Sequence, residues 1–248
     1  MTSAEDEFDA FTARMAAERQ VLGVVLSGSQ AREGAATRRS DYDVILVVAD
    51  EAGDVVDVEL RRDARLDVSV MPLTEFRTHA LHGSDTEWNR YAFTHAKVLK
   101  DTVDGLVAEL VREKGRLAPA EAAGTAAGVL DAFLNSLYRC LKNDRDGDAI
   151  AARLDGAESL PFHLACVFAL HERVRPYNKY LSWELRRYPL SRPEWEHDHL
   201  LGLLEQAVST SVVGAVRQLF NELEPHARAA GHGPVLDAWG EDLSLMRG

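Results

Sequence analysis

The sequence predicts an α+β fold, in which a small mixed sheet with flanking helices is followed by a C-terminal helical bundle domain. Two observations support this prediction. Apolar runs typical of buried strands, at Val21–Leu26 and Val44–Val48, lie in the first part of the chain. From Thr102 to Gly248 the pattern is almost wholly helical. We therefore expect one domain over residues 1–101 and a second over residues 102–248.

Further elements of the first domain follow from the spacing of apolar residues. Residues 4–19 are predicted to form a helix that packs on the sheet, because Phe8, Phe11 and Met15 lie at helical spacing. Residues 94–99 are predicted to form one more strand. The sheet thus has at least three candidate strands before the composition changes.

The segment after the second strand contains two aspartates in apolar surroundings. Residues 55–60 and 65–70 together indicate a hairpin, and the second segment alternates apolar and polar side chains as a half-buried strand does. Asp57 and Asp67 lie one in each arm. A helix is expected to follow, with Thr74 as its cap.

The second domain is predicted to consist of helices joined by short turns. Pro161 is expected to kink one of them. The predicted helices cover residues 119–144, 148–174, 177–188, 193–207, 209–230 and 233–245.

The composition excludes several classes of protein. The net charge of −12 argues against a broad nucleic-acid surface, although it would suit a cationic small molecule. No apolar run reaches the roughly 18 residues of a membrane span, so no membrane association is expected. The acidic N-terminus lacks a signal-peptide pattern, and two isolated cysteines, Cys140 and Cys166, are typical of a reduced compartment. These features predict a cytoplasmic protein.

The pattern that carries chemistry lies between the first two strands. Gly28-Ser29 ends one apolar run, where a residue without Cβ lets the main chain approach a phosphate. Asp41 and Asp43 begin the next run, two residues apart, so their carboxylates should point to the same side of the strand. Paired carboxylates repel each other, and a divalent cation such as Mg²⁺, which prefers oxygen ligands, relieves that repulsion.

At these residues the chain resembles the nucleotidyltransferase superfamily, the DNA polymerase beta-like proteins, which include the aminoglycoside and lincosamide nucleotidyltransferases. The matching stretch is LSGSQAREGAATRRSDYDVILVV, residues 26–48. The resemblance extends over roughly residues 20–100. Beyond that part, the chain is similar only in being helical.

The resemblance implies a third carboxylate on a neighbouring strand, for which Asp67 is favoured over Asp57. Asp41 and Asp43 would hold one Mg²⁺, and with Asp67 a second. Asp67 would also serve as a candidate base. The implied reaction transfers a nucleoside monophosphate, with AMP from ATP expected, to a hydroxyl and releases pyrophosphate.

The resemblance also implies groups that bind the nucleotide. Gly28, Ser29 and Ser40 would contact the triphosphate. In the second domain, expected to bind substrate and nucleotide, Lys179 is the candidate for the phosphates. Tyr180 or Tyr177 could stack on the base or on the acceptor.

The acceptor is expected to be a small molecule, such as an aminoglycoside-like antibiotic. Two alternatives stay open: transfer of AMP to a protein side chain, and a nucleotide-binding regulator without turnover. The chain could act as a monomer or a homodimer.

Overall fold

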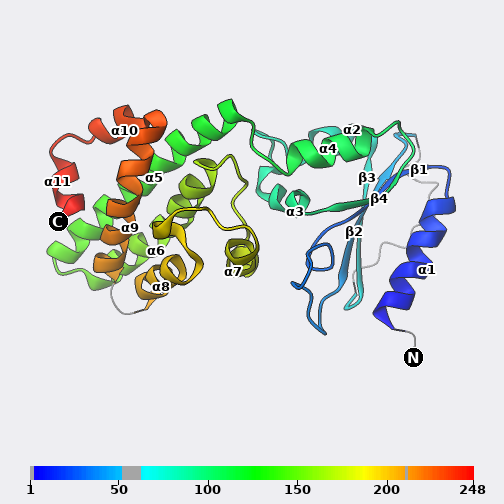
Figure 1. Cartoon of the computed structure of the whole chain (residues 1–248), viewed down its shortest axis with the longest axis horizontal. Helices are drawn as coiled ribbons and strands as arrows, with labels where there is room; N and C mark the ends of the chain where they lie inside the picture. The colour runs from blue at the N-terminus through cyan, green and yellow to red at the C-terminus, as the bar shows by residue number, and fades with distance from the viewer. Residues whose placement is uncertain (1–2, 52–62, 210–211) are drawn as a thin grey trace. The chain divides into compact units, whose positions relative to one another are not determined.

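The computed structural model describes residues 3–51, 63–209 and 212–248. The chain has an α+β fold and divides into two compact units, Met1–Arg116 and Leu117–Gly248. All of the strands in the described residues belong to the first unit, and the second is helical (Figure 1). Among the described residues, no helix combines the length and apolar character needed to cross a bilayer.

The sheet of the first unit is mixed, with the strand order β3-β2-β1-β4. Strand β1 pairs antiparallel with both β2 and β4, whereas β2 and β3 run parallel. Both parallel and antiparallel neighbours are therefore present, as the sequence predicts. The strands are β1 (Val21–Leu26), β2 (Tyr42–Val48), β3 (Leu66–Pro72) and β4 (Lys97–Asp101).

Helix α1 covers one face of this sheet (Figure 1). It begins with a capping box, in which Ser3 and Asp6 exchange side-chain to main-chain hydrogen bonds of 3.0 Å. Phe11 and Met15 are buried against apolar residues of β1, β2 and β3. The predicted N-terminal helix and its packing on the sheet are confirmed. The helix covers Ala4–Ala17.

The opposite face of the sheet packs against α2 and α4. Val107 of α4 lies so close to β1 that a Cβ on Gly23 would be 2.8 Å from a Val107 methyl group. This helix therefore belongs to the first compact unit, Met1–Arg116. The other helices of this unit are short. They are α2 (Leu73–Thr78), the 3₁₀ turn Glu87–Asn89 and α3 (Tyr91–Thr94), and α4 covers Leu106–Lys114.

The start of α2 differs from the prediction. Thr74 lies inside the helix, and Pro72 occupies the capping position without a side-chain hydrogen bond. The carboxylate of Asp50 instead accepts hydrogen bonds from the Thr74 main-chain N–H (2.8 Å) and hydroxyl (2.9 Å). The cap thus comes from the loop after β2. The first arm of the predicted hairpin, residues 55–60, lies outside the described residues, while β3 pairs with β2.

The second unit is built from helices around two long consecutive helices, α5 and α6, which are joined by a short turn at Gly147. Phe133, Phe168 and Phe220, from three different helices, are fully buried in it. Pro161 lies inside α6. The helices are α5 (Pro119–Arg145), α6 (Ala149–Ala169), α7 (Asn178–Arg187), α8 (His197–Val208), α9 (Val212–Ala227), α10 (Gly233–Asp237) and α11 (Asp242–Arg247).

Candidate functional site

Three carboxylates meet at one end of the sheet. Asp41 directly precedes β2, and Asp43 and Asp67 are direct partners in the parallel register of β2 and β3. One oxygen from each of the three carboxylates lies within 4.8 Å of the others. All three residues are partly exposed, so the group is accessible to a ligand.

Strand alternation explains why these side chains converge. Asp43 lies on the same face of β2 as Ile45, which belongs to the core beneath α2 and α4. Tyr42, between the two aspartates, points to the other face and stacks on Phe8 of α1, with ring centroids 4.2 Å apart. Burial, followed by the charges of Glu5 and Asp9, raises the pKa of Tyr42. Tyr42 thus packs with α1 on one face of β2, and the aspartates lie on the other face.

The chemistry of this donor set fits a hard divalent cation. Three carboxylates held close together repel one another, and each offers the oxygen ligands that Mg²⁺ prefers. Asp41, Asp43 and Asp67 are therefore the residues that could hold such an ion. Asp57, the alternative third acid, lies outside the described residues.

The Gly28-Ser29 turn lies directly against this acidic group. The Ser27 main-chain N–H donates to the Asp43 carbonyl oxygen at 2.8 Å, and Gly28 follows with a positive φ of 62°. A Cβ added to Gly28 would lie 1.6 Å from Asp43 Oδ2. Glycine is required here for two reasons, because a side chain would be strained and would also displace a carboxylate. Ser29, the next residue, is 1% exposed.

Ser40 holds the turn that leads into Asp41. Its hydroxyl accepts a hydrogen bond of 2.9 Å from the Thr37 main-chain N–H. The Ser40 carbonyl oxygen accepts from the Gln30 side chain at 3.5 Å, which links this turn to the one that contains Ser29. Ser40 therefore has a structural role in placing Asp41.

Arg32 is a residue of this site that the sequence analysis missed. It is 2% exposed and lies four residues after Gly28. Its guanidinium donates to the Gly28 carbonyl oxygen and, at 2.9 Å, to the Tyr91 carbonyl oxygen, and it lies 4.7 Å from the Tyr91 ring centroid. An arginine in a polar loop gives no sequence signal for burial, so only the fold shows this contact.

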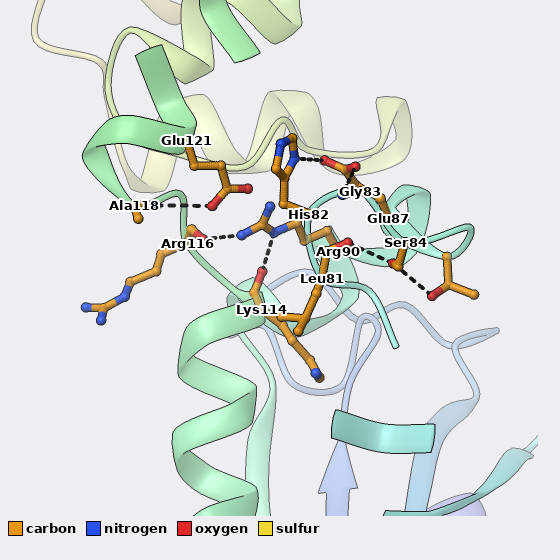
Figure 2. A network of polar contacts seen from close by, with 11 residues as sticks. Leu81, His82, Gly83, Ser84, Glu87, Arg90, Lys114, Arg116, Ala118 and Glu121 are labelled. Atoms are coloured by element: carbon orange, nitrogen blue, oxygen red, sulfur yellow. Dashed lines mark hydrogen bonds and ion pairs between the residues drawn. The ribbon is translucent and has the colours of Figure 1, made fainter. Parts of the chain in front are cut away.

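The neighbour of Tyr91, Arg90, is also buried. Figure 2 shows its guanidinium donating to the carbonyl oxygens of Lys114 (3.0 Å) and Arg116 (2.7 Å), at the end of α4. The Lys114 ammonium lies over the Phe76 ring, 5.0 Å from its centroid. Burial lowers the pKa of Lys114 to about 8. Arg90 and Tyr91 thus form a rigid segment that is anchored to α4.

Lys179 and Tyr180 lie in the second unit, at the start of α7, whereas the carboxylates and the Gly28 turn lie in the first. Lys179 is exposed, and its ammonium is 5.1 Å from the Tyr180 ring centroid. Tyr180 is 7% exposed. In the structure these two residues form a cation–π pair on one helix.

Comparisons with known proteins add little to this geometry. No protein-family model matches the chain, and no curated protein matches it. Among solved structures, the chain is similar to a nucleotidyltransferase-like protein from Exiguobacterium sibiricum. The TM-score is 0.49 at 12% identity, over 94% of this chain and 78% of the other. A likeness at this level does not decide function. The function of this chain is therefore inferred from the geometry of its own site.

Proposed function

We propose that this protein is a Mg²⁺-dependent nucleotidyltransferase. The observation that supports this function is the meeting of Asp41, Asp43 and Asp67 beside the Gly28-Ser29 turn. A metal-binding group of acids next to a turn with little side-chain bulk suits a triphosphate, whose charge a divalent cation neutralises.

Each residue has a role in this proposal. Asp41 and Asp43 hold one Mg²⁺, and together with Asp67 they hold a second. When bound, the ions neutralise the charge that develops on the entering and leaving oxygens. The Gly28 main chain is proposed to contact the triphosphate, and Ser40 contributes from the adjacent turn. Ser29 is proposed to add its hydroxyl, which requires it to become more accessible than the 1% exposure in the structure.

The reaction joins the acceptor oxygen to the α-phosphorus of ATP. The bond from that phosphorus to the bridging oxygen breaks, and pyrophosphate leaves. Asp67 accepts the proton of the acceptor hydroxyl. The protein contributes mainly by holding these groups in line, as in other phosphoryl transfers.

The donor, the acceptor and the remaining contacts rest on the resemblance of residues 26–48 to antibiotic nucleotidyltransferases. On that basis ATP is the proposed donor, and a hydroxyl of a small aminoglycoside-like molecule is the proposed acceptor. Lys179 is proposed to contact the phosphates. Tyr180 is proposed to contact the base, which requires its ring to become more accessible than the 7% exposure in the structure.

The test is pyrophosphate release from ATP, GTP, CTP and UTP with Mg²⁺, measured with aminoglycosides, lincosamides and a fractionated cell extract as acceptors. Release that depends on a small acceptor is the expected result. Release only with the protein fraction would redirect the proposal to protein modification. An absence of release from any fraction, with tight Mg²⁺-dependent nucleotide binding, would instead indicate a regulator.

Variants of the aspartates assign the site. Asp43→Asn should abolish release, whereas Asp85→Asn, an exposed aspartate of the same unit, should leave it unchanged. Asp67→Asn and Asp57→Asn compare the two candidate third acids, and only Asp67→Asn is expected to be inactive. A folded Asp43→Asn protein with the wild-type rate would exclude the metal site.

A further inference from the structure

Arg32 is a buried cation whose hydrogen bonds join two distant parts of the first unit. It donates to the carbonyl oxygen of Gly28, four residues away, and to that of Tyr91, 59 residues away. Its own main-chain N–H also donates to the Ser29 carbonyl oxygen at 3.2 Å. One side chain thus holds both the start of the Gly28-Ser29 turn and the N-terminal end of α3.

Burial of this guanidinium requires compensation. A charged group that is 2% exposed is costly unless hydrogen bonds and favourable electrostatics replace its hydration. The Tyr91 ring, 4.7 Å from the guanidinium carbon, adds a cation–π contact. Only arginine offers a planar fork that reaches two carbonyl oxygens while lying on a ring, because lysine presents a compact point charge.

The partner of Arg32 is itself fixed. Tyr91 is 1% exposed, and the preceding Arg90 donates to two carbonyl oxygens at the end of α4 (Figure 2). Helix α4 in turn packs through Val107 on β1. The Tyr91 carbonyl oxygen is therefore a rigid point of attachment, against which Arg32 can hold the turn.

The turn passes this constraint to a carboxylate. Asp43 Oδ2 occupies the space that a Cβ would take on Gly28, at 1.6 Å from that position. Any shift of Gly28 toward Asp43 would push the carboxylate aside. The position of the Gly28 main chain thus limits where the Asp43 oxygens can lie.

We infer that Arg32 is a positioning residue for the acidic site: it ties the Gly28-Ser29 turn to Tyr91 and thereby fixes both the turn and the Asp43 carboxylate. This inference rests on the proposed function, because it assigns Arg32 a role in metal and triphosphate binding. Arg32 is assigned this role through the two main-chain carbonyl oxygens that it contacts, those of Gly28 and Tyr91.

The experiment measures Mn²⁺ binding by electron paramagnetic resonance, together with kcat and KM for pyrophosphate release, in the full chain. Arg32→Lys and Arg32→Gln should weaken Mn²⁺ binding about tenfold or more, the range found when residues that orient metal ligands are lost. They should also lower kcat. Tyr91→Leu, which keeps the carbonyl oxygen but removes the ring, should have a smaller effect in the same direction.

Two controls separate positioning from general damage. Tyr91→Phe keeps both the ring and the carbonyl oxygen that Arg32 contacts, so it should retain Mn²⁺ binding that Tyr91→Leu loses. Arg145→Gln removes an exposed arginine of the second unit that pairs with the neighbouring Asp146, and it should also leave binding unchanged. If the Arg32 variants fail to fold, the graded comparison of Tyr91→Leu with Tyr91→Phe still decides the outcome.

The outcomes distinguish this inference from the proposed function. Wild-type Mn²⁺ affinity and kcat in folded Arg32→Lys and Arg32→Gln, or in Tyr91→Leu where the Arg32 variants do not fold, would overturn the inference alone. Mn²⁺ binding that is equally tight in wild type and Asp43→Asn, or absent in wild type, would overturn the proposed function and this inference with it. Weakened binding in the Arg32 variants with intact controls supports both.

Discussion

Replacement of Gly28 by alanine tests the coupling between the turn and the acids most directly. The added Cβ would lie 1.6 Å from Asp43 Oδ2 and 2.6 Å from its Cγ. To restore ordinary van der Waals contact the oxygen must retreat by about 1.8 Å, from 1.6 Å to 3.4 Å. The carboxylate would then leave the group that it forms with Asp41 and Asp67.

Two effects of Gly28→Ala can be given magnitudes. Alanine at a φ of +62° costs about 1–2 kcal/mol in backbone strain. In a chain of this size, each kcal/mol of lost stability lowers Tm by about 2–4 °C. A displacement of more than 1 Å in a reacting group typically costs about 100-fold in rate, so kcat/KM should fall at least that far.

Gly34→Ala is the matched control. Gly34 also has a positive φ, of 76°, but nothing lies within 4 Å of its Cβ position. The two variants therefore share the backbone penalty and differ only in the clash with Asp43. Thermal unfolding should show the strain penalty in both variants and a further loss from the clash in Gly28→Ala. Mn²⁺ affinity should be lost in Gly28→Ala alone.

Equal Mn²⁺ affinity in the two variants would refute this reasoning. It would mean that the Asp43 carboxylate can move away from Gly28 without cost to the site. A double variant, Gly28→Ala with Asp43→Ala, adds a second check. Removal of the carboxylate should recover part of the stability lost in Gly28→Ala, because the closest contact disappears.

Three further predictions concern other parts of the chain. Asp43→Asn should leave Tm unchanged or raise it, since it relieves repulsion among the acids; calorimetry checks this. Asp50→Ala should cost about 1 kcal/mol in urea unfolding through loss of the α2 cap, and Asp50→Asn less. Burial lowers the pKa of His163 to about 4. As the pH falls, the unfolded state therefore protonates this histidine before the folded state does. The free energy of unfolding should be highest above pH 6.5 and fall by about 3 kcal/mol toward pH 4. His163→Leu should flatten this pH dependence.

Local patterns were sufficient to predict the elements that carry the site. The apolar runs around Gly28-Ser29 and after Asp41 form β1 and β2, and the spacing of Phe11 and Met15 marks the face of α1 that packs on the sheet. The convergence of Asp41 and Asp43 follows from strand alternation alone. These features depend on neighbours within a few residues of one another.

Contacts between distant segments could not be predicted in this way. The parallel pairing that puts Asp67 opposite Asp43 and the capping of Thr74 by Asp50 both join residues far apart in the sequence. The first unit continues to Arg116 because α4 packs on the sheet, yet its sequence pattern resembles that of the helices that follow. Arg32 gives no periodic signal at all.

The parallel register of β2 and β3 has a consequence for the changes in chain length that this protein can accept. Because side chains alternate along a strand, one residue inserted or deleted inside β3 would turn Asp67 to the opposite face and exchange buried and exposed positions along the strand. A change in length ahead of Asp63, whose carboxylate accepts from the main-chain N–H groups of Arg65 and Leu66, leaves that alternation intact. Insertions and deletions are therefore expected between β2 and β3, where a change in length leaves Asp43 and Asp67 in place.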